Sequence, residues 1–205
     1  MSEQPAPGGL RERKRRRTRA QLALTAVELI AERGLQQVRI EDICERADVS
    51  RSTFFRTFGS KESAFVEGVH LGRLEALVAA LRDRPGTEPP VDAVRNAMLD
   101  AFADWRSELD NLRLEAQIRS ESRAVQAWAS AQRATWADAV ASALAARFPP
   151  DDDGLDGAAL LAGSAMTALR VAAERWMADG ASHSPQPYID ASFDRLRRLW
   201  GGSGG

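Results

Sequence analysis

The segment from Arg39 to Glu62 constrains the fold more than any other part of the chain, because it predicts two short helices joined by a tight turn. Ile40, Ile43 and Ala47 form the apolar face of the first helix, and the small side chain of Ala47 lets a second helix approach closely. Asp48 follows at the turn, where a short polar residue tolerates a positive φ better than a branched one. Two helices packed against each other are therefore expected within this short stretch.

The second helix of the pair is expected to begin after Ser50, which is a good N-cap residue. Phe54 and Phe58 are four residues apart and face the interior. The opposite face of this helix has no carboxylate and carries arginine and hydroxyl side chains, namely Arg51, Ser52, Thr53, Arg56 and Thr57. Arginine bonds guanine in the major groove, and serine or threonine bonds bases or phosphates. This face predicts a helix that reads double-stranded DNA. A third helix should begin at Ser60, with Lys61 placed for a phosphate.

The net charge of the whole chain conceals an uneven distribution. The chain holds 28 Lys and Arg against 29 Asp and Glu, whereas nucleic-acid-binding domains are typically basic. Residues 1–65 nevertheless carry a net charge of +4 and residues 66–205 a net charge of −5. Residues 11–19 hold seven positive side chains and one negative side chain. We expect this basic arm, through Arg15, Arg16 and Arg17, to reach phosphates or the minor groove.

The pattern from residue 43 to residue 62, following a helix that ends at Arg33-Gly34, resembles the DNA-binding domain of the TetR family of one-component transcriptional regulators. The matching residues are Ile43-Cys44, Ala47-Asp48-Val49-Ser50 and Thr53-Phe54-Phe55-Arg56-Thr57-Phe58-Gly59-Ser60-Lys61-Glu62. The resemblance covers about residues 13–66. It implies three small helices followed by a ligand-binding and dimerisation domain. It also implies that Arg51, Ser52 and Thr53 meet base edges, and that Phe55, Thr57 and Lys61 lie along phosphates.

Two positions depart from the family pattern. The family commonly has Tyr-x-His-Phe where this chain has Phe55-Arg56-Thr57-Phe58, so Phe55 can give only packing. Arg39 stands where a threonine cap is usual, which leaves the first helix of the pair without a side-chain acceptor. We expect Arg39 to contact a phosphate instead. The complete set of expected DNA-binding residues is Arg15, Arg16, Arg17, Arg39, Ser50, Arg51, Ser52, Thr53, Phe55, Arg56, Thr57 and Lys61.

The remainder of the chain also predicts helices. Prolines at residues 85–90, 149–150 and 185–187 mark boundaries, and no segment alternates with period two. The expected helices run from Ser60 to about Arg84, Val91 to Trp105, Leu109 to Ser120, Ala124 to Arg147, Leu155 to Asp179 and Ile189 to Trp200. The fold class is therefore all-α, with an N-terminal three-helix DNA-binding domain that contains a helix-turn-helix. A helical-bundle domain for ligand binding and dimerisation follows.

The expected domain division has four parts: a disordered leader (residues 1–12), the helix-turn-helix domain (13–61), the ligand-binding and dimerisation domain (62–200) and a flexible tail (201–205). The longest uncharged run, Gly157 to Leu169, falls short of a bilayer span, so no membrane segment is expected. The single cysteine, Cys44, allows no internal disulfide, which favours the cytoplasm. Cys44 should be a buried apolar filler on the inward side of its helix rather than a redox sensor.

The C-terminal part resembles regulators linked to mycofactocin biosynthesis genes, which are described as binding acyl-CoA-like ligands. The residues that carry this resemblance are Arg84-Pro85-Gly86, Pro89-Pro90-Val91-Asp92-Ala93-Val94-Arg95, Leu112-Arg113-Leu114, Leu169-Arg170 and Ala173-Glu174-Arg175-Trp176. Bundles of this type form ligand cavities between helices. The expected cavity residues are Trp105, Leu114, Ile118, Trp136, Met166 and Arg170. Arg170 interrupts an uncharged stretch, so it either extends to the surface or meets an anionic ligand group. Trp200 is expected at a two-fold interface.

No catalytic residue, metal site or cofactor is expected. His70 and His183 are the only histidines and lie far apart in the sequence. Neither a nucleophile elbow nor a P-loop nor a dinucleotide fingerprint occurs. Residues Asp151 to Asp153 follow two prolines and precede a helix, so they are interpreted as a charge cluster that favours the helix dipole rather than as a cation site.

These features predict a ligand-responsive transcriptional regulator, most simply a repressor, that binds a pseudo-palindromic operator as a homodimer. A small-molecule effector in the C-terminal domain would favour a dimer whose reading helices are too far apart, with the helix from Ser60 to Arg84 as the lever. Two alternatives remain open. The same fold could serve an activator or a regulator controlled by a partner protein. A helical enzyme or carrier could instead use the C-terminal cavity without operator binding.

Overall fold

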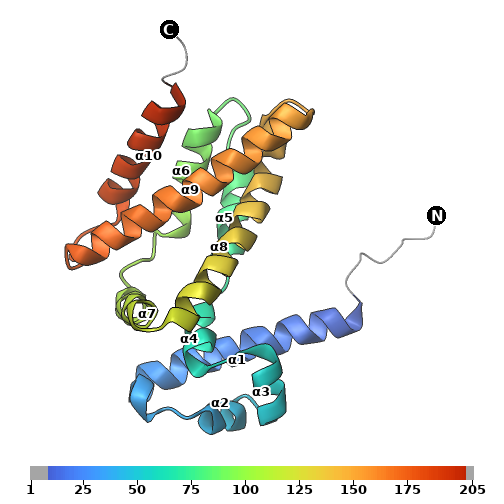
Figure 1. Ribbon diagram of the computed structural model, residues 1–205, viewed down its shortest axis with the longest axis vertical. Coiled ribbons are helices and arrows are strands. Elements are labelled where there is room, and N and C mark those ends of the chain that lie inside the picture. Colours follow the sequence, from blue (N-terminus) through green and yellow to red (C-terminus); the bar gives the residue numbers. More distant parts are fainter. Residues whose placement is uncertain (1–8, 202–205) are drawn as a thin grey trace. The chain divides into compact units, whose positions relative to one another are not determined.

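The computed structural model describes residues 9–201, which form helices joined by turns and loops, with no strand in that range (Figure 1). The expected all-α fold class is confirmed. The chain divides into two compact units, Met1–Leu71 and Gly72–Gly205. The first unit extends beyond the expected boundary at residue 61 because the helix after that position packs within it.

The first unit is organised around its first and last helices. Its elements are α1 (Leu10–Arg33), the 3-10 turn η1 (Leu35–Gln37), α2 (Ile40–Arg46), α3 (Arg51–Thr57) and α4 (Lys61–Val69). Helix α1 packs along α4, and α2 packs against both α1 and α3. The buried side chains repeat at helical spacing along α1, and they include Leu22, Ala26, Leu29 and Ile30, as the sequence predicts.

The expected ends of these elements are confirmed by their backbone geometry. Gly34 has a φ of 80° and donates its backbone N–H to the carbonyl of Ile30 over 2.8 Å, as a C-terminal glycine should. Asp48 takes a positive φ of 51° at the turn between α2 and α3. Ser50 and Ser60 accept backbone N–H groups of Thr53 and Ser63, and so cap α3 and α4.

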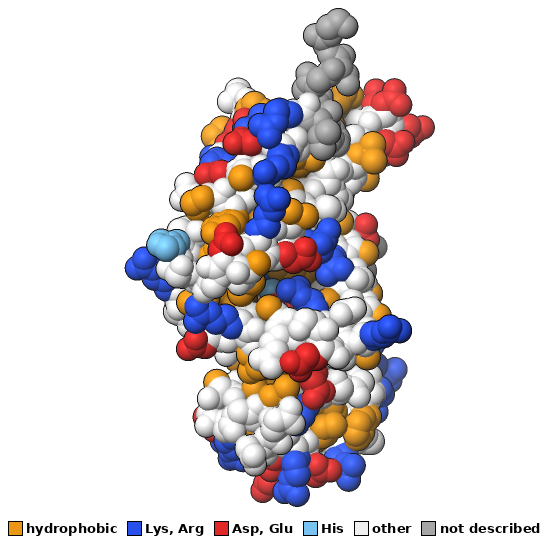
Figure 2. All heavy atoms as spheres, turned by 60° about the vertical axis from the view of Figure 1, so that its left-hand side comes forward, with side chains coloured by type: hydrophobic (Ala, Val, Ile, Leu, Met, Phe, Trp, Pro, Cys, Tyr) orange, Lys and Arg blue, Asp and Glu red, His pale blue; other side chains and the backbone are white. Residues whose placement is uncertain are grey.

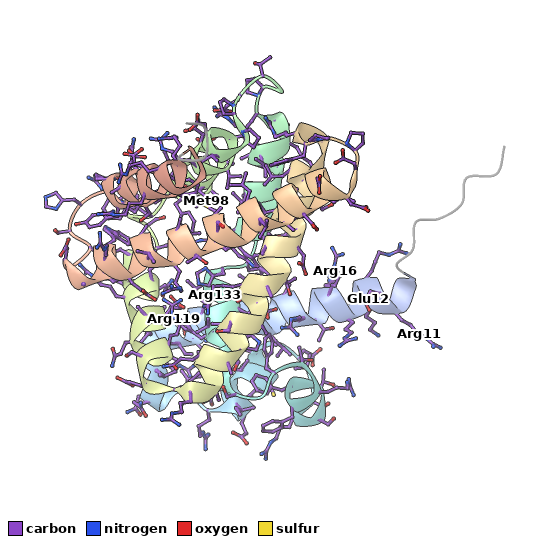
Figure 3. All side chains as sticks on the ribbon, turned by 45° about the horizontal axis from the view of Figure 1, so that its top comes forward. Arg11, Glu12, Arg16, Met98, Arg119 and Arg133 are labelled. Carbon is purple, nitrogen blue, oxygen red and sulfur yellow. The ribbon has the colours of Figure 1, made fainter. Side chains whose placement is uncertain are left out.

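The basic arm is part of α1. The helix begins at Leu10, so residues 10–12 are helical and the expectation that they belong to a disordered leader is wrong. Residues 1–8 of that expected leader lie outside the described residues. Arginine and lysine are good helix formers, which favours extension of the helix through this segment. The side chains from Arg11 to Arg17 are exposed, and Figure 3 shows Arg11 and Arg16 on this end of α1, directed away from it.

The second unit is a bundle around the longest helix of the chain. Its elements are α5 (Arg73–Asp83), α6 (Pro90–Ala101), α7 (Leu109–Glu121), α8 (Arg123–Leu144), the 3-10 turn η2 (Ala145–Arg147), α9 (Asp152–Ala178) and α10 (Gln186–Gly201). Helix α9 packs against α8 and α10, and α5 packs against α6 and α8. Their contact faces form one apolar core that includes Leu77, Met98, Leu144, Leu161 and Phe193. The side chains of Leu199 and Trp200, and residues 202–205 of the expected tail, lie outside the described residues.

Two expected helices are shorter in the structure. The helix expected from Ser60 to Arg84 is two helices, because α4 ends at Val69 and α5 begins after Gly72. Gly72 has a φ of 81°, a left-handed conformation that glycine adopts without strain and that interrupts a right-handed helix. The helix expected to reach Trp105 ends at Ala101 and is followed by turns up to Glu108.

Helix α9 is longer than the uncharged run that predicts it. By length and composition alone its 27 residues could cross a membrane, since an 18-residue stretch of the helix has a mean hydropathy of 1.2. The expectation that no segment is long enough is therefore wrong, since the helix continues past both ends of Gly157 to Leu169. One face of α9 packs into the bundle core, as in the central helix of a soluble domain.

The acidic cluster before α9 starts that helix. Asp151 accepts the backbone N–H of Gly154 over 2.8 Å, and Asp152 and Asp153 lie in the first turn, where carboxylates favour the helix dipole. No group of three or more histidine, cysteine or acidic side chains within residues 9–201 is arranged to hold a metal ion.

Candidate DNA-binding site

The inward faces of α2 and α3 fix the orientation of the pair. Ile43, Cys44 and Phe54 are buried, and the rings of Phe54 and Phe58 lie with their centroids 6.0 Å apart. The expected position of Cys44 inside the protein is confirmed. Burial raises the pKa of the Cys44 thiol, with the nearby carboxylate of Glu41 adding to the effect, so the thiol stays protonated at neutral pH. This packing directs the other side of α3 to solvent.

The outward face of α3 presents the side chains expected to read DNA. Arg51, Ser52, Phe55 and Arg56 are exposed, and half of the Phe55 side chain is accessible. The hydroxyls around the start of the helix are bonded to one another, because the Ser50 Oγ lies 2.9 Å from the Ser52 Oγ and 3.0 Å from the Thr53 Oγ1. The face is thus formed before DNA arrives, with hydroxyl groups that can exchange partners.

Thr57 and Arg56 occupy positions that the helix itself explains. The Thr57 hydroxyl donates to the carbonyl of Thr53 over 2.8 Å, the usual bond of a helical threonine to the preceding turn. An Arg56 guanidinium nitrogen donates to the Thr53 Oγ1 over 3.4 Å. To accept a hydrogen bond from Thr57, a phosphate would have to replace the bond to Thr53, because the hydroxyl has one hydrogen, whereas the Arg56 guanidinium has further N–H donors.

Helix α2 brings a carboxylate to the reading helix. The Glu41 Oε1 lies 3.1 Å from an Arg51 guanidinium nitrogen, and both side chains are largely exposed. Helix α3 itself carries no carboxylate, as predicted, but the neighbouring helix supplies one. Acidic and basic side chains also occur together on the part of the surface formed by the first unit (Figure 2). No local signal in the sequence indicates this pair, because ten positions separate the two residues.

Arg39 is the N-cap residue of α2, and Asp42 supplies the side-chain acceptor at this end of the helix. The Arg39 backbone N–H donates to the Asp42 Oδ2 over 2.7 Å. The Arg39 guanidinium has no acceptor atom, so it cannot accept the backbone N–H of Asp42 in return. The Arg39 side chain is 76% exposed, and its Nε lies 3.9 Å from the Asp42 Oδ2, so a phosphate would compete with this carboxylate. Asp42 lies three residues after Arg39, so it supplies one of the two hydrogen bonds of a capping box. This spacing is visible in the sequence and could have predicted the bond.

Lys61, expected to lie along a phosphate, bonds two backbone carbonyls within the first unit. Its ammonium group donates to the backbone carbonyls of Leu35 and Val38, each over 2.7 Å. Two of its three donors therefore hold the segment between α1 and α2. The remaining donor is the only one that a phosphate could use.

Arg19 and Glu67 form a buried link that the sequence analysis missed. The Arg19 guanidinium donates two hydrogen bonds to the Glu67 carboxylate, whose residue is 8% exposed. It also donates to the Thr57 carbonyl over 3.4 Å and lies 4.9 Å from the centroid of the Phe58 ring. Helices α1, α3 and α4 are thereby joined through one side chain. The sequence could have indicated that Arg19 faces the interior, because it lies on the same helical face as the buried residues Ala23 and Ala26.

The six expected cavity residues are dispersed in the second unit. Met166 and Trp136 contribute to the apolar core, Ile118 is buried and Leu114 is half-buried. The Trp105 ring meets the Trp176 ring edge to face, with centroids 5.4 Å apart. Arg170 extends to the surface, where one guanidinium nitrogen lies 2.8 Å from both carboxylate oxygens of Glu174. The Arg170 side chain is 38% exposed, so it is partly buried as well as paired with Glu174.

An open groove lies between α9 and α10. It is lined by Asp156, Ala159, Leu160, Gly163, Ser164, Thr167, Ala168, Val171, Ser192, Arg195 and Leu196. Leu160 is 64% exposed and Leu155, one turn earlier on α9, is 57% exposed. Helix α10 adds exposed arginines, and Figure 2 shows basic side chains in a row with hydrophobic side chains beside them. None of the six expected cavity residues lines this groove.

Each of the two units contains a segment that matches the model of a known protein family. Residues 24–67 match the family model described as bacterial regulatory proteins of the tetR family, and residues 88–201 match the model described as the MftR C-terminal domain. The chain belongs to the TetR family of bacterial transcriptional regulators. Both resemblances noted in the sequence are confirmed.

Individual relatives agree with this assignment. The regulator TcmR of Streptomyces glaucescens is 42% identical over 93 residues, which are 45% of this chain and 41% of TcmR. The chain thus matches less than half of that relative's length. MftR of Mycobacterium tuberculosis, named for transcriptional regulation of mycofactocin biosynthesis, is 29% identical over 138 residues, 66% of this chain and 68% of MftR. A crystal structure described as a TetR-family regulator from Mesorhizobium loti shares the fold, with a TM-score of 0.53, 18% identity and coverage of 91% and 98% of the two chains.

Membership in the TetR family gives α2 and α3 their function. They form the helix-turn-helix of this TetR-family regulator, a motif whose second helix commonly enters the major groove of DNA. TetR-family proteins are regulators rather than enzymes, and they typically act as dimers.

Proposed function

We propose that this TetR-family protein is a cytoplasmic repressor that binds a pseudo-palindromic operator as a homodimer and leaves it when a small molecule binds the second unit. The observation that carries the proposal is the outward face of α3, on which Arg51 is 65% exposed beside a row of hydroxyl side chains. An arginine at this position of a reading helix can bond guanine O6 and N7 in the major groove.

The groove between α9 and α10 supports the dimer. The exposed side chain of Leu160 lines this groove together with Ala159, Ala168, Val171 and Leu196, and a self-complementary apolar face is what a two-fold interface requires. Two copies of α3 would then enter successive major grooves, about 34 Å apart along the DNA.

The effector belongs to the second unit in this proposal. The likeness of residues 88–201 to the MftR C-terminal domain supports an acyl-CoA-like molecule, the ligand class implied by the sequence resemblance. Such a ligand acts by binding one spacing of the two reading helices better than the other, and its effect cannot exceed that difference in affinity.

The DNA-binding part of the proposal is tested with Arg51→Ala. Binding of DNA from upstream of the protein's own gene is measured by gel shift, with Arg33→Ala as the matched control, since Arg33 is an exposed arginine of the same unit at the far end of α1. Arg51→Ala should weaken specific binding at least about tenfold while Arg33→Ala binds normally. Equal affinity of the two variants would show that α3 does not read the operator through Arg51.

Repression and release need separate measurements. Transcription from the operator-bearing promoter in vitro should fall when the protein is added and recover when an acyl-CoA is added. A rise in transcription on adding the protein would favour an activator. Repression that no acyl-CoA relieves would favour control by another ligand or by a partner protein.

A further inference from the structure

The second unit contains a buried guanidinium that its neighbours do not fully satisfy. Arg73 opens α5, and its side chain is 9% exposed. One of its terminal nitrogens, Nη2, pairs with Glu108, and its guanidinium lies 5.0 Å from the centroid of the Phe102 ring. The other terminal nitrogen, Nη1, is buried and has no hydrogen-bond partner within the described part of the chain. Leaving such a donor without a partner is costly.

A buried carboxylate connects Arg73 to helix α7. Glu115 is 3% exposed, and its Oε1 lies 3.3 Å from a guanidinium nitrogen of Arg119, one turn further along α7. Burial lowers the pKa of Arg73, and the Glu115 carboxylate opposes that shift, which places the two charges within electrostatic range. Arg73 and Arg119 therefore share one acidic neighbour.

Helix α8 adds a third arginine to this group. Arg133 is half-buried, and its one hydrogen bond in the described structure runs from Nη2 to the Ser130 hydroxyl over 2.6 Å. It makes no ion pair with any described carboxylate. Figure 3 shows Arg133 and Arg119 as neighbours in the space between α8 and α7. Partial burial lowers the pKa of Arg133, and the positive charges of Arg119 and Arg170 lower it further.

Positive charge is in excess at this point in the bundle. Arg73, Arg119 and Arg133 are faced by Glu115 and by Glu108, whose side chain is 40% exposed to water. Arg170 is paired with Glu174 and so brings no free charge. Buried charges are usually matched by counter-charges, because an unpaired one is strongly destabilising. An additional anion would supply the missing charge.

We propose that Arg73, Arg119 and Arg133 form a binding site for the anionic group of a small molecule, a carboxylate or a phosphate. The donors come from three helices of the same unit, and a guanidinium presents paired N–H groups that match both oxyanions. This proposal rests on the proposed function in that the bound molecule would be the effector.

The surroundings favour an anion attached to an apolar body. The turn that supplies Glu108 and Phe102 also supplies Trp105, whose buried ring packs on Trp176. Ile118, next to Arg119 on α7, is buried as well. We therefore choose decanoate and decyl phosphate as probes, and 1-decanol as the neutral molecule of the same chain length.

The experiment measures binding of the three probes by calorimetry to the full chain and to three variants. Arg133→Gln removes the arginine that has no ion pair, and Arg133→Lys keeps the charge without the paired donors. Arg123→Gln is the matched control, because Arg123 is an exposed arginine on the same helix. Both anions should bind the unmodified protein, and 1-decanol should bind at least about tenfold more weakly. Arg133→Gln should lose at least about tenfold in anion affinity, Arg133→Lys should lose less, and Arg123→Gln should bind normally.

A readout of stability separates binding from a purely structural role. The ligand-free Arg133→Gln variant should melt at or above the temperature of the unmodified protein, because the substitution removes a partly buried charge and its repulsion with Arg119. A lower melting temperature together with equal losses for 1-decanol and the anions would overturn the site, as would absence of anion binding. Operator release is measured separately. If the anions bind but the operator stays bound, the anion site stands and only its role in the proposed function fails.

Discussion

Arg51 has to change partners when its helix meets DNA. In the free protein its guanidinium is 3.1 Å from the Glu41 carboxylate at the protein surface. Exposed ion pairs of this kind contribute about 1 kcal/mol or less, so a guanine that offers two acceptors can replace the carboxylate. The same carboxylate should repel nearby DNA phosphates, so we expect Glu41 to lower the affinity of the protein for DNA of any sequence.

Replacement of Glu41 should therefore tighten DNA binding. Glu41→Gln removes the partner of Arg51 and one negative charge near the phosphates, so affinity for DNA should rise by about threefold or more, most clearly for non-specific sequences. The measurement is a fluorescence anisotropy titration with operator and scrambled duplexes. Glu28→Gln, which changes an exposed carboxylate on α1, should leave both affinities unchanged. Equal effects of the two substitutions would contradict a role for the Glu41–Arg51 pair.

Glu88 makes the stability of the second unit depend on pH. Arg84 donates two hydrogen bonds to its carboxylate, of 2.7 and 2.9 Å, and Asn96 donates a third of 2.6 Å. The Arg84 bonds are the main reason why the pKa of Glu88 is lowered in the folded protein. A lowered pKa means that the folded state favours the ionised form. The resulting stabilisation is present above the carboxyl pKa of the unfolded chain and is lost as the pH falls through the folded-state value.

Glu88→Gln should accordingly lower the free energy of unfolding at neutral pH by about 1 kcal/mol. The difference from the unmodified protein should shrink in acid, where Glu88 is protonated in both folded and unfolded states. Urea unfolding at the two pH values measures this change. Glu75→Gln, an exposed change on the neighbouring part of α5, is the control and should show no such dependence. A pH-independent difference for Glu88→Gln would mean that ionisation of Glu88 does not contribute.

At the scale of the elements, the contact between α1 and α4 depends on one glycine. Gly68 lies where the two helices meet, and a Cβ atom built on it would be 2.4 Å from the carbonyl oxygen of Ala23 and 2.6 Å from a methyl carbon of Val27. No side chain fits at this distance, so the backbones of α1 and α4 approach only because residue 68 is glycine. The Arg19–Glu67 link lies beside this contact and holds the same two helices.

Gly68→Ala should force α1 and α4 apart and destabilise the first unit by about 1–3 kcal/mol, as overpacking usually does. The loss should be visible as a lower melting temperature and as weaker operator binding. Gly59→Ala is the control for stability, since a Cβ there meets nothing within 4 Å and the residue lies outside the core. A melting temperature unchanged by Gly68→Ala would show that the two helices can separate at little cost.

The same scale shows where helix prediction from sequence succeeded. Local signals located α2 and α3 to within a residue, because Asp48, Ser50 and Ser60 act on their immediate neighbours. The break between α4 and α5 was missed. The apolar spacing continues through Gly72, and a glycine inside a helical pattern is tolerated often enough to give no clear stop. The segment from Ser60 to Arg84, which was expected to act as a lever, is therefore two helices joined by a turn rather than one continuous helix.

At the scale of the whole molecule, basic and acidic residues are divided between two functions. The first unit, residues 1–71, carries 13 Lys and Arg against 10 Asp and Glu, a net charge of +3 that suits DNA binding, and residues 72–205 carry 15 against 19, a net charge of −4. Because the two charges nearly cancel, the net charge of the whole chain does not indicate whether the protein binds nucleic acid. The proposed dimer is the other property at this scale, and we place its interface at the groove of α9 and α10.

Leu160→Glu should disrupt the proposed dimer. A carboxylate within an apolar interface loses its hydration without gaining a partner, so the dimer should dissociate to monomers at micromolar concentration. Analytical ultracentrifugation measures the mass. Leu24→Glu changes another exposed leucine, in the first unit, and should leave the mass unchanged. A Leu160→Glu protein that stays dimeric would place the two-fold interface on a surface other than this groove.

The all-α class, the caps and turn of the helix-turn-helix and membership in the TetR family all followed from the sequence, which also led us to expect a DNA-reading face on α3. Each of these follows from residues close together in the chain, whose effects on the backbone are local. Tertiary structure alone decided which charges meet. Glu41 reaches Arg51, Glu67 reaches Arg19, Lys61 bonds the carbonyls after α1, and Glu108 reaches Arg73. Those pairings join separate helices, so they depend on packing distances that no spacing along the chain encodes.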